Sequence, residues 1–545
     1  MIEDRARILI VAALAALPLL WDLGDRYLWQ DEASTAVLAE RMMRHGRPLA
    51  WDGRNLLTMD VAEKLSTAKT QRLSADPDAA IRYFVDRGDF KADTTWVGHP
   101  WGQFAVTGVS FALLGKGTWQ ARLPFALMAV VAAVLTYALA RRRFTSPLVA
   151  PIAVVLLLTN VYWILHMRQC RYYAASSLLM LITLAAWLRW QEDRRLGAVG
   201  FVGAAWCWFQ FDYGSFWPVI GVLMVEALRS SWRRPHEPLK VGFVLAAGVA
   251  PFVWWYELTS RLKPTALPWP ERFFGNLVLV DHYVVPLLVL VSSVLWLTLQ
   301  SRPRPKETHL LGVIAAIIAA FLIWVPLSTP FPFHRYAVVL TPLGCLLAAW
   351  LVSELARAAG TGWRRGAVAA TLTLALVVTL LASLPVTFAM PERHRQVAGN
   401  SNWLRRELFL YATELTGQLP DPNRRVIDYL RARLHPGDEV LINYEDKPVM
   451  FYTDARVRGG IPGFRVGAED GTAPRFVVLR NSAGLAPHDM IRRAMRSGHW
   501  EEVHVGAPDV PWGNIPEPAF RFRLLRTSDE QISIFERRSR GRNPE

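Results

Sequence analysis

Cysteine is scarce in this sequence. Only three cysteines, Cys170, Cys207 and Cys345, occur among 545 residues, and all three lie in or beside apolar segments. This spacing predicts neither a disulfide framework nor a CxxC metal site. The HExxH and EF-hand ligand patterns are also missing from the sequence. The residues therefore assign no metal site, and a divalent metal, which His99 and Glu32 could share, stays open as a cofactor.

Charged residues are scarce as well. They make up 20% of the chain, whereas 52% of the residues are hydrophobic and 23 are tryptophan. This composition is too apolar for an ordinary soluble protein of this length. The formal net charge is +15, but the sequence has no basic domain with interleaved aromatic residues, as single-strand binders have. Composition thus predicts a polytopic helical membrane protein without a nucleic-acid partner.

Long apolar runs recur along the chain. A helix needs roughly 17–25 apolar residues to cross the hydrocarbon core of a bilayer. The first run begins like a signal peptide but continues through Leu20 and Trp21 and is followed by further spans, so we expect an uncleaved anchor. The runs predict about eleven transmembrane helices. These lie near residues 8–24, 120–140, 147–165, 173–188, 197–211, 214–229, 240–257, 283–299, 309–327, 336–356 and 366–389.

Arginine and lysine gather in alternate connections between these runs. The positive-inside rule places such connections in the cytoplasm. The amino terminus is then cytoplasmic, whereas Asp31, the loop 258–282, the turn at 333–335 and everything after Met390 lie outside. The basic clusters are at residues 141–143, 189–195, 229–234, 302–306 and 357–365.

The apolar segment 98–115 is not expected to cross the membrane. If it crossed, the three arginines at 141–143 would move outside, and every later connection would break the positive-inside rule. Trp96, Trp101 and Phe104 suit a membrane boundary. We therefore expect a helix in the outer interface, within a large first outside loop over residues 25–118.

Two outside regions have their own predicted architecture. In the first loop, residues 31–46 and 78–88 have the pattern of helices lying along the membrane surface. After residue 390 the spanning runs end, and strand-like and amphipathic pieces follow. We predict a transmembrane domain over residues 1–390 and a soluble α/β domain over residues 391–545. Its strands are expected at 438–444, 475–481 and 531–538, and its helices at 424–438 and 488–500.

Ionisable residues at the outer membrane edge are the candidate functional groups, because such groups are costly there and usually face a cavity. The acidic pair Asp31 and Glu32 opposes several cations. This mixture suits displacement of an anionic leaving group: a carboxylate acts as general base, and cations compensate the charge of a departing phosphate. The other candidates are His99, Arg168, Arg171, Tyr172, His334, Arg335 and Tyr336.

Each candidate also has a purely structural interpretation. Asp31 and Glu32 could stabilise the positive end of the helix that they begin. The arginines could anchor helix ends by extending into the headgroup region, and the tyrosines could belong to an interfacial aromatic belt. His99, which precedes Pro100, could be a turn residue. The residues alone leave both interpretations open.

Five pieces of sequence carry a resemblance to a known family. They are "DE" at 31–32, "GHPWGQF" at 98–104, "RQCRYYAASSLLM" at 168–180, "FHRYAVVLTPL" at 333–343 and "VIDYLRARLHPGDEVLINYEDKPV" at 426–449. In this order, and on this side of the membrane, the chain resembles bacterial glycosyltransferase family 39. These proteins are relatives of the protein O-mannosyltransferases and of the lipid A aminoarabinose transferase, and they have the type C glycosyltransferase fold.

The resemblance implies an inverting hexosyl or pentosyl transferase (EC 2.4 class) that uses a polyprenyl-phosphate-linked sugar and a periplasmic acceptor, namely a lipid, glycan or protein. It implies that Asp31 is the base and that Glu32 supports it or binds the acceptor. Arg168, Arg171 and Tyr172 would face the donor phosphate. The turn with His334, Arg335 and Tyr336 would approach the lipid carrier, and His99 would line the site or bind the acceptor.

The chain departs from the aminoarabinose branch of this family at two places. Residues 160–177 contain no acid, and His99 stands where those relatives carry lysine. Both departures argue against lipid A as the acceptor. Two other classes of protein stay open: a membrane transporter, and a catalytically inactive protein of the same fold that binds glycans or lipids.

Overall fold

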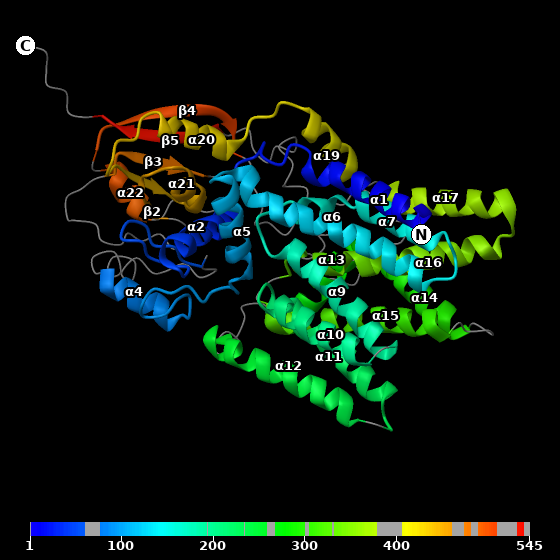
Figure 1. Ribbon diagram of the computed structural model, residues 1–545. Coiled ribbons are helices and arrows are strands. Elements are labelled where there is room, and N and C mark those ends of the chain that lie inside the picture. Colours follow the sequence, from blue (N-terminus) through cyan, green and yellow to red (C-terminus); the bar gives the residue numbers. More distant parts are fainter. Residues whose placement is uncertain are drawn as a thin grey trace, which may run out of the picture. The chain divides into compact units, whose positions relative to one another are not determined.

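The computed structural model describes most of the chain as two compact units (Figure 1). The helical unit contains the described residues of Met1–Trp21 and Leu123–Leu415, and the sheet unit contains those of Asp22–Arg122, Thr416–Ile515 and Ala519–Glu545. The described residues are 2–59, 77–192, 194–233, 235–258, 268–299, 305–329, 332–378, 406–459, 474–480, 489–496, 498–509 and 531–538.

Every predicted apolar run contains a helix. The helix pairs α9 and α10, α11 and α15, and α7 and α16 pack against each other. The last predicted run continues past Val378, outside the described residues. The helices are α1 (Ile2–Leu20), α6 (Thr118–Arg143), α7 (Val149–Leu158), α8 (Val161–Met167), α9 (Tyr173–Glu192), α10 (Arg194–Phe209), α11 (Tyr213–Ser230), α12 (His236–Trp255), α13 (Trp269–Tyr283), α14 (Leu287–Leu299), α15 (Pro305–Ser328), α16 (Thr341–Ala358), α17 (Gly362–Val378) and α19 (Arg406–Thr416).

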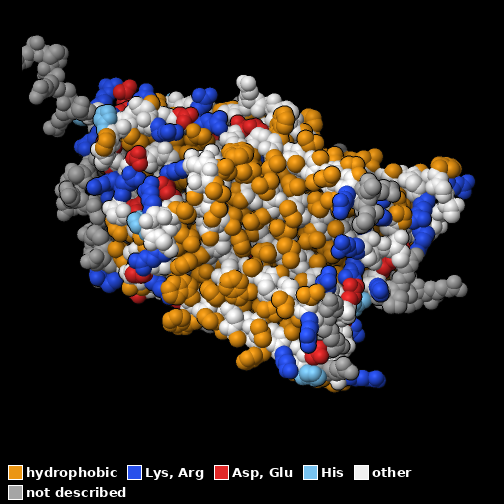
Figure 2. Space-filling model, in the orientation of Figure 1, with side chains coloured by type: hydrophobic (Ala, Val, Ile, Leu, Met, Phe, Trp, Pro, Cys, Tyr) orange, Lys and Arg blue, Asp and Glu red, His pale blue; other side chains and the backbone are white. Residues whose placement is uncertain are grey.

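These helices have the surface of a membrane protein. Figure 2 shows a broad face of hydrophobic side chains over them, with lysine and arginine gathered at one end. Large apolar side chains such as Val199, Phe243 and Trp254 are each 74% exposed, which suits contact with lipid. Among the described residues, five helices are long and apolar enough to cross a membrane, or seven if each of two bent pairs is one span. The count of eleven spans stays a prediction.

Two helix pairs are sharply bent, and only the first lies within a single predicted span, 147–165. In the second pair, α14 lies in the predicted span 283–299, and α13 precedes it. α7 and α8 meet at an angle of 69°, and α13 and α14 meet at 84°. At the first break, Asn160 caps α8 by accepting a hydrogen bond from the Trp163 amide (3.0 Å), and its own amide donates to the Tyr283 carbonyl (2.8 Å). Pro286 lies at the second break and cannot donate a helical hydrogen bond. Asn160 thus satisfies backbone groups at both breaks, as groups at membrane depth require.

The sheet unit is built on a five-stranded mixed sheet. The strand order is β2-β1-β3-β5-β4. β1 pairs in parallel with β2 and with β3, and β5 pairs antiparallel with β3 and with β4. Leu441, Val477 and Ile491 form a small core between the sheet and α22. All three predicted strands and both predicted helices of this region are present. The elements are β1 (Glu439–Ile442), β2 (Arg456–Gly459), β3 (Phe476–Leu479), β4 (Trp500–Pro508), β5 (Gln531–Arg537), α20 (Pro422–Arg431), α21 (Asp446–Tyr452) and α22 (Asp489–Arg496).

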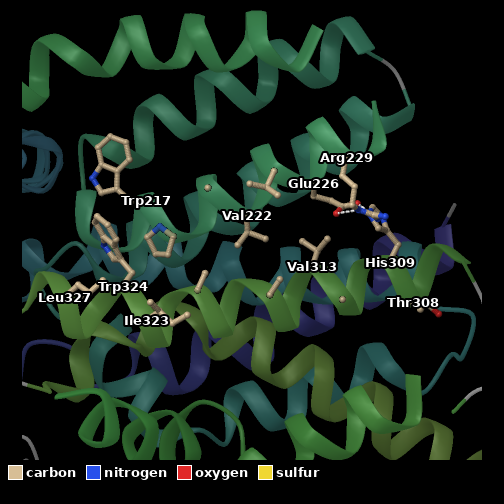
Figure 3. A pocket seen from close by; sticks show the side chains of 16 residues that line it. Trp217, Val222, Glu226, Arg229, Thr308, His309, Val313, Ile323, Trp324 and Leu327 are labelled. Carbon is tan, nitrogen blue, oxygen red and sulfur yellow. Dashed lines mark hydrogen bonds and ion pairs between the residues drawn. The ribbon is translucent and has the colours of Figure 1, made fainter. Parts of the chain in front are cut away.

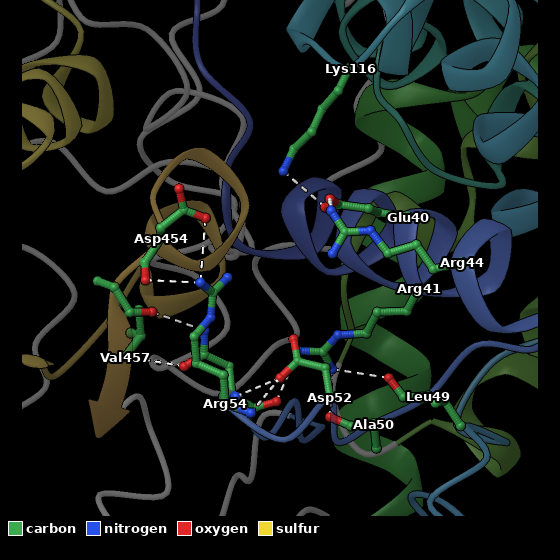
Figure 4. A network of polar contacts seen from close by, with 12 residues as sticks. Glu40, Arg41, Arg44, Leu49, Ala50, Asp52, Arg54, Lys116, Asp454 and Val457 are labelled. Carbon is green, nitrogen blue, oxygen red and sulfur yellow. Dashed lines mark hydrogen bonds and ion pairs between the residues drawn. The ribbon is translucent and has the colours of Figure 1, made fainter. Parts of the chain in front are cut away.

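The first loop joins this sheet to form one unit. It contributes α2 (Gln30–His45), α4 (Pro77–Asp86) and α5 (Gly102–Leu114). The buried Arg41 of α2 donates to the carbonyls of Ala50 and Asn55 and forms an ion pair with Asp52 at 2.7 Å (Figure 4). The Asn55 side chain then accepts a hydrogen bond from the Val457 amide of β2 (2.8 Å). Residues separated by about 400 positions are thereby held together.

Candidate functional site

The predicted base lies at the start of α2. Trp29 is the N-cap residue, and Asp31 and Glu32 are in the first turn, as the sequence predicts. From Leu28 to Ala39 every residue except Asp31 is buried. Asp31 therefore has the one partly exposed side chain in this stretch. Its backbone carbonyl accepts a hydrogen bond from the Thr35 hydroxyl (3.2 Å), which supports the first turn.

The Glu32 side chain is fully buried and held by Arg122. The Arg122 guanidinium donates two hydrogen bonds to the Glu32 carboxylate, at 2.8 Å and 2.6 Å. It also donates to the carbonyls of Leu23 (3.0 Å) and Arg26 (2.7 Å), in the segment that leads into α2. A bidentate pair of this kind fixes geometry as well as charge. Glu32 and Arg122 therefore hold the turn that presents Asp31.

Arg122 was missed by the sequence analysis, although a signal for it was present. An arginine close to the start of an apolar span, as in "TWQARLPF" at 118–125, needs a partner at the membrane edge. His99, the other predicted residue of the sheet unit, is partly exposed and stacks on Trp96 with ring centroids 6.1 Å apart. Its imidazole is thus held by a neighbouring ring and remains a candidate for lining the site.

The Arg168 side chain, in the helical unit, forms hydrogen bonds with other residues of the chain. It follows α8, and its guanidinium donates to the carbonyls of Pro18 (2.7 Å) and Trp21 (2.6 Å), at the end of α1. It also donates to the Tyr411 hydroxyl (2.7 Å). These three bonds give Arg168 an anchoring role, which is the structural interpretation that the sequence left open.

Arg171 and Tyr172 lie in the connection between α8 and α9. Arg171 is buried and its guanidinium carbon lies 5.3 Å from the centroid of the Tyr172 ring, whereas Tyr172 is partly exposed. Burial raises the pKa of the Tyr172 phenol well above its usual value, nearby Tyr173 and Asp212 raise it further, and Arg171 opposes the rise. The phenol is therefore protonated and can donate a hydrogen bond to an anion at any physiological pH.

The predicted late turn is a short 3-10 helix, η2 (His334–Tyr336), and a second one, η3 (Val338–Leu340), follows it. η3 packs against α9, and Tyr336 is close enough to Tyr172 to affect the pKa of its phenol. The Arg335 guanidinium carbon lies 4.5 Å from the Phe333 ring centroid. The side chain of His334 lies outside the described structure. Two connections about 160 residues apart in sequence thus lie close together.

Asp212 is an acidic neighbour of this cluster that the sequence analysis missed. It caps α11 by accepting hydrogen bonds from the Gly214 amide (2.9 Å) and the Ser215 amide (3.4 Å). Its charge also acts on Tyr172. The sequence signal was "FDYGS" at 211–215, since an aspartate just before a helix is a common cap. Asp212 thus places an acid close to Tyr172, although residues 160–177 contain none.

A separate groove lies between α11 and α15, with a volume of about 1050 Å³ (Figure 3). Its lining is mostly apolar, from Trp217 and Trp324 to Val313. At one end, the Glu226 carboxylate accepts hydrogen bonds from Arg229 (2.6 Å) and His309 (2.6 Å). None of the predicted site residues lines this groove. Within the described residues, no group of three or more His, Cys, Asp or Glu side chains could hold a metal ion.

Comparisons with known proteins agree with this architecture. Residues 98–255 match the sequence model of the dolichyl-phosphate-mannose-protein mannosyltransferase family. No curated protein matches the chain. Two crystal structures of ArnT from Cupriavidus metallidurans are similar, one bound to undecaprenyl phosphate and one in the apo state. Each covers 97% of this chain and 98% of its own at 16% sequence identity, with TM-scores of 0.55 and 0.57 respectively.

The match to the mannosyltransferase family model includes the His99 segment and the Arg171–Tyr172 connection, two of the five pieces on which the sequence resemblance rests. The likeness to ArnT extends over nearly the whole chain and establishes the fold. The resemblance expected from the sequence is thereby confirmed: the chain has the type C fold of the glycosyltransferases, and its residues 98–255 carry the sequence pattern of the dolichyl-phosphate-mannose-protein mannosyltransferases.

Proposed function

We propose that this protein is an inverting glycosyltransferase that moves a sugar from a polyprenyl-phosphate carrier to an acceptor at the outer face of a bacterial inner membrane. The observation that carries the proposal is the first turn of α2, where Asp31 alone stays accessible while Glu32 is fixed by Arg122. The fold shared with ArnT, one structure of which holds undecaprenyl phosphate, supports a donor of this class.

Asp31 acts as the general base in this proposal. The acceptor hydroxyl or phosphate attacks the anomeric carbon, Asp31 takes the proton when the acceptor is a hydroxyl, and the bond from that carbon to the carrier phosphate breaks with its electron pair on oxygen. The phosphate leaves without a proton, so a second catalytic carboxylate is not required. Glu32 is assigned a supporting role, because its carboxylate is occupied by Arg122.

The cluster in the helical unit binds the donor phosphate in this proposal. Arg171 and Arg335 supply positive charge, and the hydroxyls of Tyr172 and Tyr336 donate hydrogen bonds to phosphate oxygens. Asp212 caps α11 beside this cluster and orients the loop. Arg168 is assigned to anchoring α1 rather than to the phosphate, because three groups of the chain already accept hydrogen bonds from its guanidinium.

Replacing Arg335 tests the phosphate assignment. We expect Arg335→Ala to weaken binding of undecaprenyl phosphate roughly tenfold to a hundredfold, because a hydrogen bond to a charged group contributes about 1.5–3 kcal/mol. Arg168→Ala should instead lower thermal stability and leave affinity nearly unchanged. Native mass spectrometry of the purified chain with added undecaprenyl phosphate measures affinity, and Arg364→Ala, at an exposed position of α17, is the matched control. Unchanged affinity for Arg335→Ala contradicts the assignment.

The function itself is tested in a strain that lacks this chain. We expect one polyprenyl-phosphate-linked sugar to accumulate in the lipid extract, and one surface glycan or modified lipid or protein to lose that sugar. Mass spectrometry of both fractions identifies donor and acceptor together, and complementation with the intact gene must reverse both changes. If both fractions match those of the parent strain, the assignment as a transferase is wrong.

A further inference from the structure

The segment that leads into α2 is held by the carboxyl-terminal part of the chain. The Tyr27 amide donates to the Asp421 carboxylate (2.6 Å), and the Leu28 amide donates to the Tyr452 hydroxyl (3.0 Å). The Leu28 carbonyl accepts a hydrogen bond from the Asn423 side chain (3.3 Å). Three side chains, from α20, its N-cap residue and α21, therefore satisfy backbone groups just before the residue that we propose as base.

Gln30, the residue directly before Asp31, makes a further connection to the carboxyl-terminal part of the chain. Its side chain is fully buried, and its amide nitrogen donates to the Asp446 carboxylate at 2.6 Å. Its amide oxygen accepts a hydrogen bond from the Lys447 backbone amide (3.4 Å). A buried amide whose donor and acceptor are both used fixes one side-chain orientation. Asp446 and Lys447 thus define where the first turn of α2 lies.

The receiving side of this contact is itself rigidly built. Glu445, next to Asp446, has φ = 62°, a left-handed conformation that is uncommon outside glycine and tends to occur at functional sites. The Asn423 side chain donates to the Glu445 carboxylate (3.3 Å) and accepts a hydrogen bond from the buried Arg480 (2.8 Å). Arg480 is paired with the buried Asp509 at 2.7 Å. The strained turn is therefore connected to the sheet by a chain of buried polar contacts.

Tyr452 holds the same segment from the other end of α21. Its ring stacks on Tyr27 with centroids 4.2 Å apart, and its hydroxyl is hydrogen-bonded to the Thr118 hydroxyl (2.6 Å). Burial raises the pKa of this phenol well above its usual value, so it stays neutral. The acidic pair at 445–446, which by sequence is typical of a solvated loop, is thus part of a buried support.

We propose that Asp446, acting through Gln30, is a positioning residue that fixes Asp31 for catalysis, and that the carboxyl-terminal sheet region is required for this reason. This inference rests on the proposed function of Asp31. Asp446 does not touch the substrate in this account. It sets the distance from the Asp31 carboxylate to the acceptor, and small misplacements of a catalytic group lower the maximal rate more than they lower binding.

The test compares rate with binding in the full-length chain. Membranes from a strain that lacks the chain supply donor and acceptor, and release of polyprenyl phosphate is followed by mass spectrometry. We expect Asp446→Ala and Gln30→Leu each to lower the maximal rate about tenfold to a hundredfold. Substrate binding, measured as the amount of added membrane that gives the half-maximal rate, should not change. The double variant should be no slower than the slower single variant, because both changes remove the same contact.

Conservative and control variants separate positioning from general stability. Asp446→Asn keeps an acceptor oxygen for Gln30 and should restore most of the rate. Asp454→Ala, whose carboxylate is 98% exposed and meets Arg54 at 3.3 Å, should leave the rate unchanged. If Asp446→Ala does not fold, Tyr452→Phe, which removes the acceptor for the Leu28 amide, replaces it and should lower the maximal rate in the same selective way.

Asp31→Asn assayed in parallel distinguishes the possible failures. If Asp31→Asn is inactive while Asp446→Ala and Gln30→Leu keep the full rate, the positioning inference is wrong and the proposed function stands. If Asp31→Asn keeps the full rate, the proposed function is wrong. Equal losses of rate in Asp446→Asn and Asp446→Ala also overturn the inference, since the retained acceptor oxygen would then have no effect.

Discussion

Asp31→Asn is expected to abolish sugar transfer while leaving the protein folded. The asparagine side chain has the same shape but cannot accept a proton, and a general base contributes about 10²- to 10⁴-fold to a rate. Because Asp31 is the one partly exposed residue in an otherwise buried stretch, and asparagine has nearly the same size, we expect the replacement to leave the fold intact. Release of polyprenyl phosphate by the purified chain measures the effect, and thermal unfolding checks the fold.

Glu40→Gln is the matched control for this experiment. Glu40 lies on the same helix and pairs with Arg44 and Lys116 near the surface. Its conversion to an amide removes a carboxylate from α2 without changing the first turn, so the rate should stay within about twofold, as surface pairs contribute little. Turnover by Asp31→Asn at the rate of the unmodified chain would remove the base assignment.

Arg122→Met is expected to cause a large loss of stability in the sheet unit. The change removes the guanidinium that pairs with the buried Glu32 carboxylate and donates to two carbonyls of the segment before α2. Removing one member of a buried ion pair costs about 3–5 kcal/mol. Thermal unfolding of the detergent-purified protein should show a markedly lower midpoint, together with a loss of activity.

Two further variants give this prediction its controls. Arg44→Met breaks an ion pair whose arginine side chain is 67% exposed, so the midpoint should hardly change. The double variant Glu32→Leu with Arg122→Met replaces both charged groups by apolar ones and should recover part of the stability lost by Arg122→Met alone. An Arg122→Met protein as stable as the Arg44→Met protein would show that the buried pair does not hold the turn.

Local patterns in the sequence predicted most of the elements. A helix is present at each apolar run, and the three strand-like pieces coincide with β1, β3 and β5. The first turn of α2 was predicted because acids commonly begin helices. Such features depend on neighbouring residues, so they can be read from a short window of the chain. The bend at Asn160 was not predicted, because it depends on the Tyr283 carbonyl more than 120 residues away.

The supporting residues of the site could not be predicted in the same way. Arg122 meets Glu32 across 90 positions, and Asp446 meets Gln30 across 416 positions. Asp446 by itself has the pattern of a solvated loop acid, and Arg168 has the pattern of a phosphate ligand. Only the fold shows that Asp446 is buried against α2 and that Arg168 holds the end of α1. The long-range polar contacts of the fold therefore show which residues support the site and which remain candidates for binding or catalysis.

The central claim is that cations of the helical unit bind the phosphate of a polyprenyl-phosphate donor. An experimental structure of the full-length chain with bound undecaprenyl phosphate measures this most directly. The account predicts the phosphate in contact with Arg171 and Arg335. A phosphate bound elsewhere, for example at the groove between α11 and α15, would contradict the account.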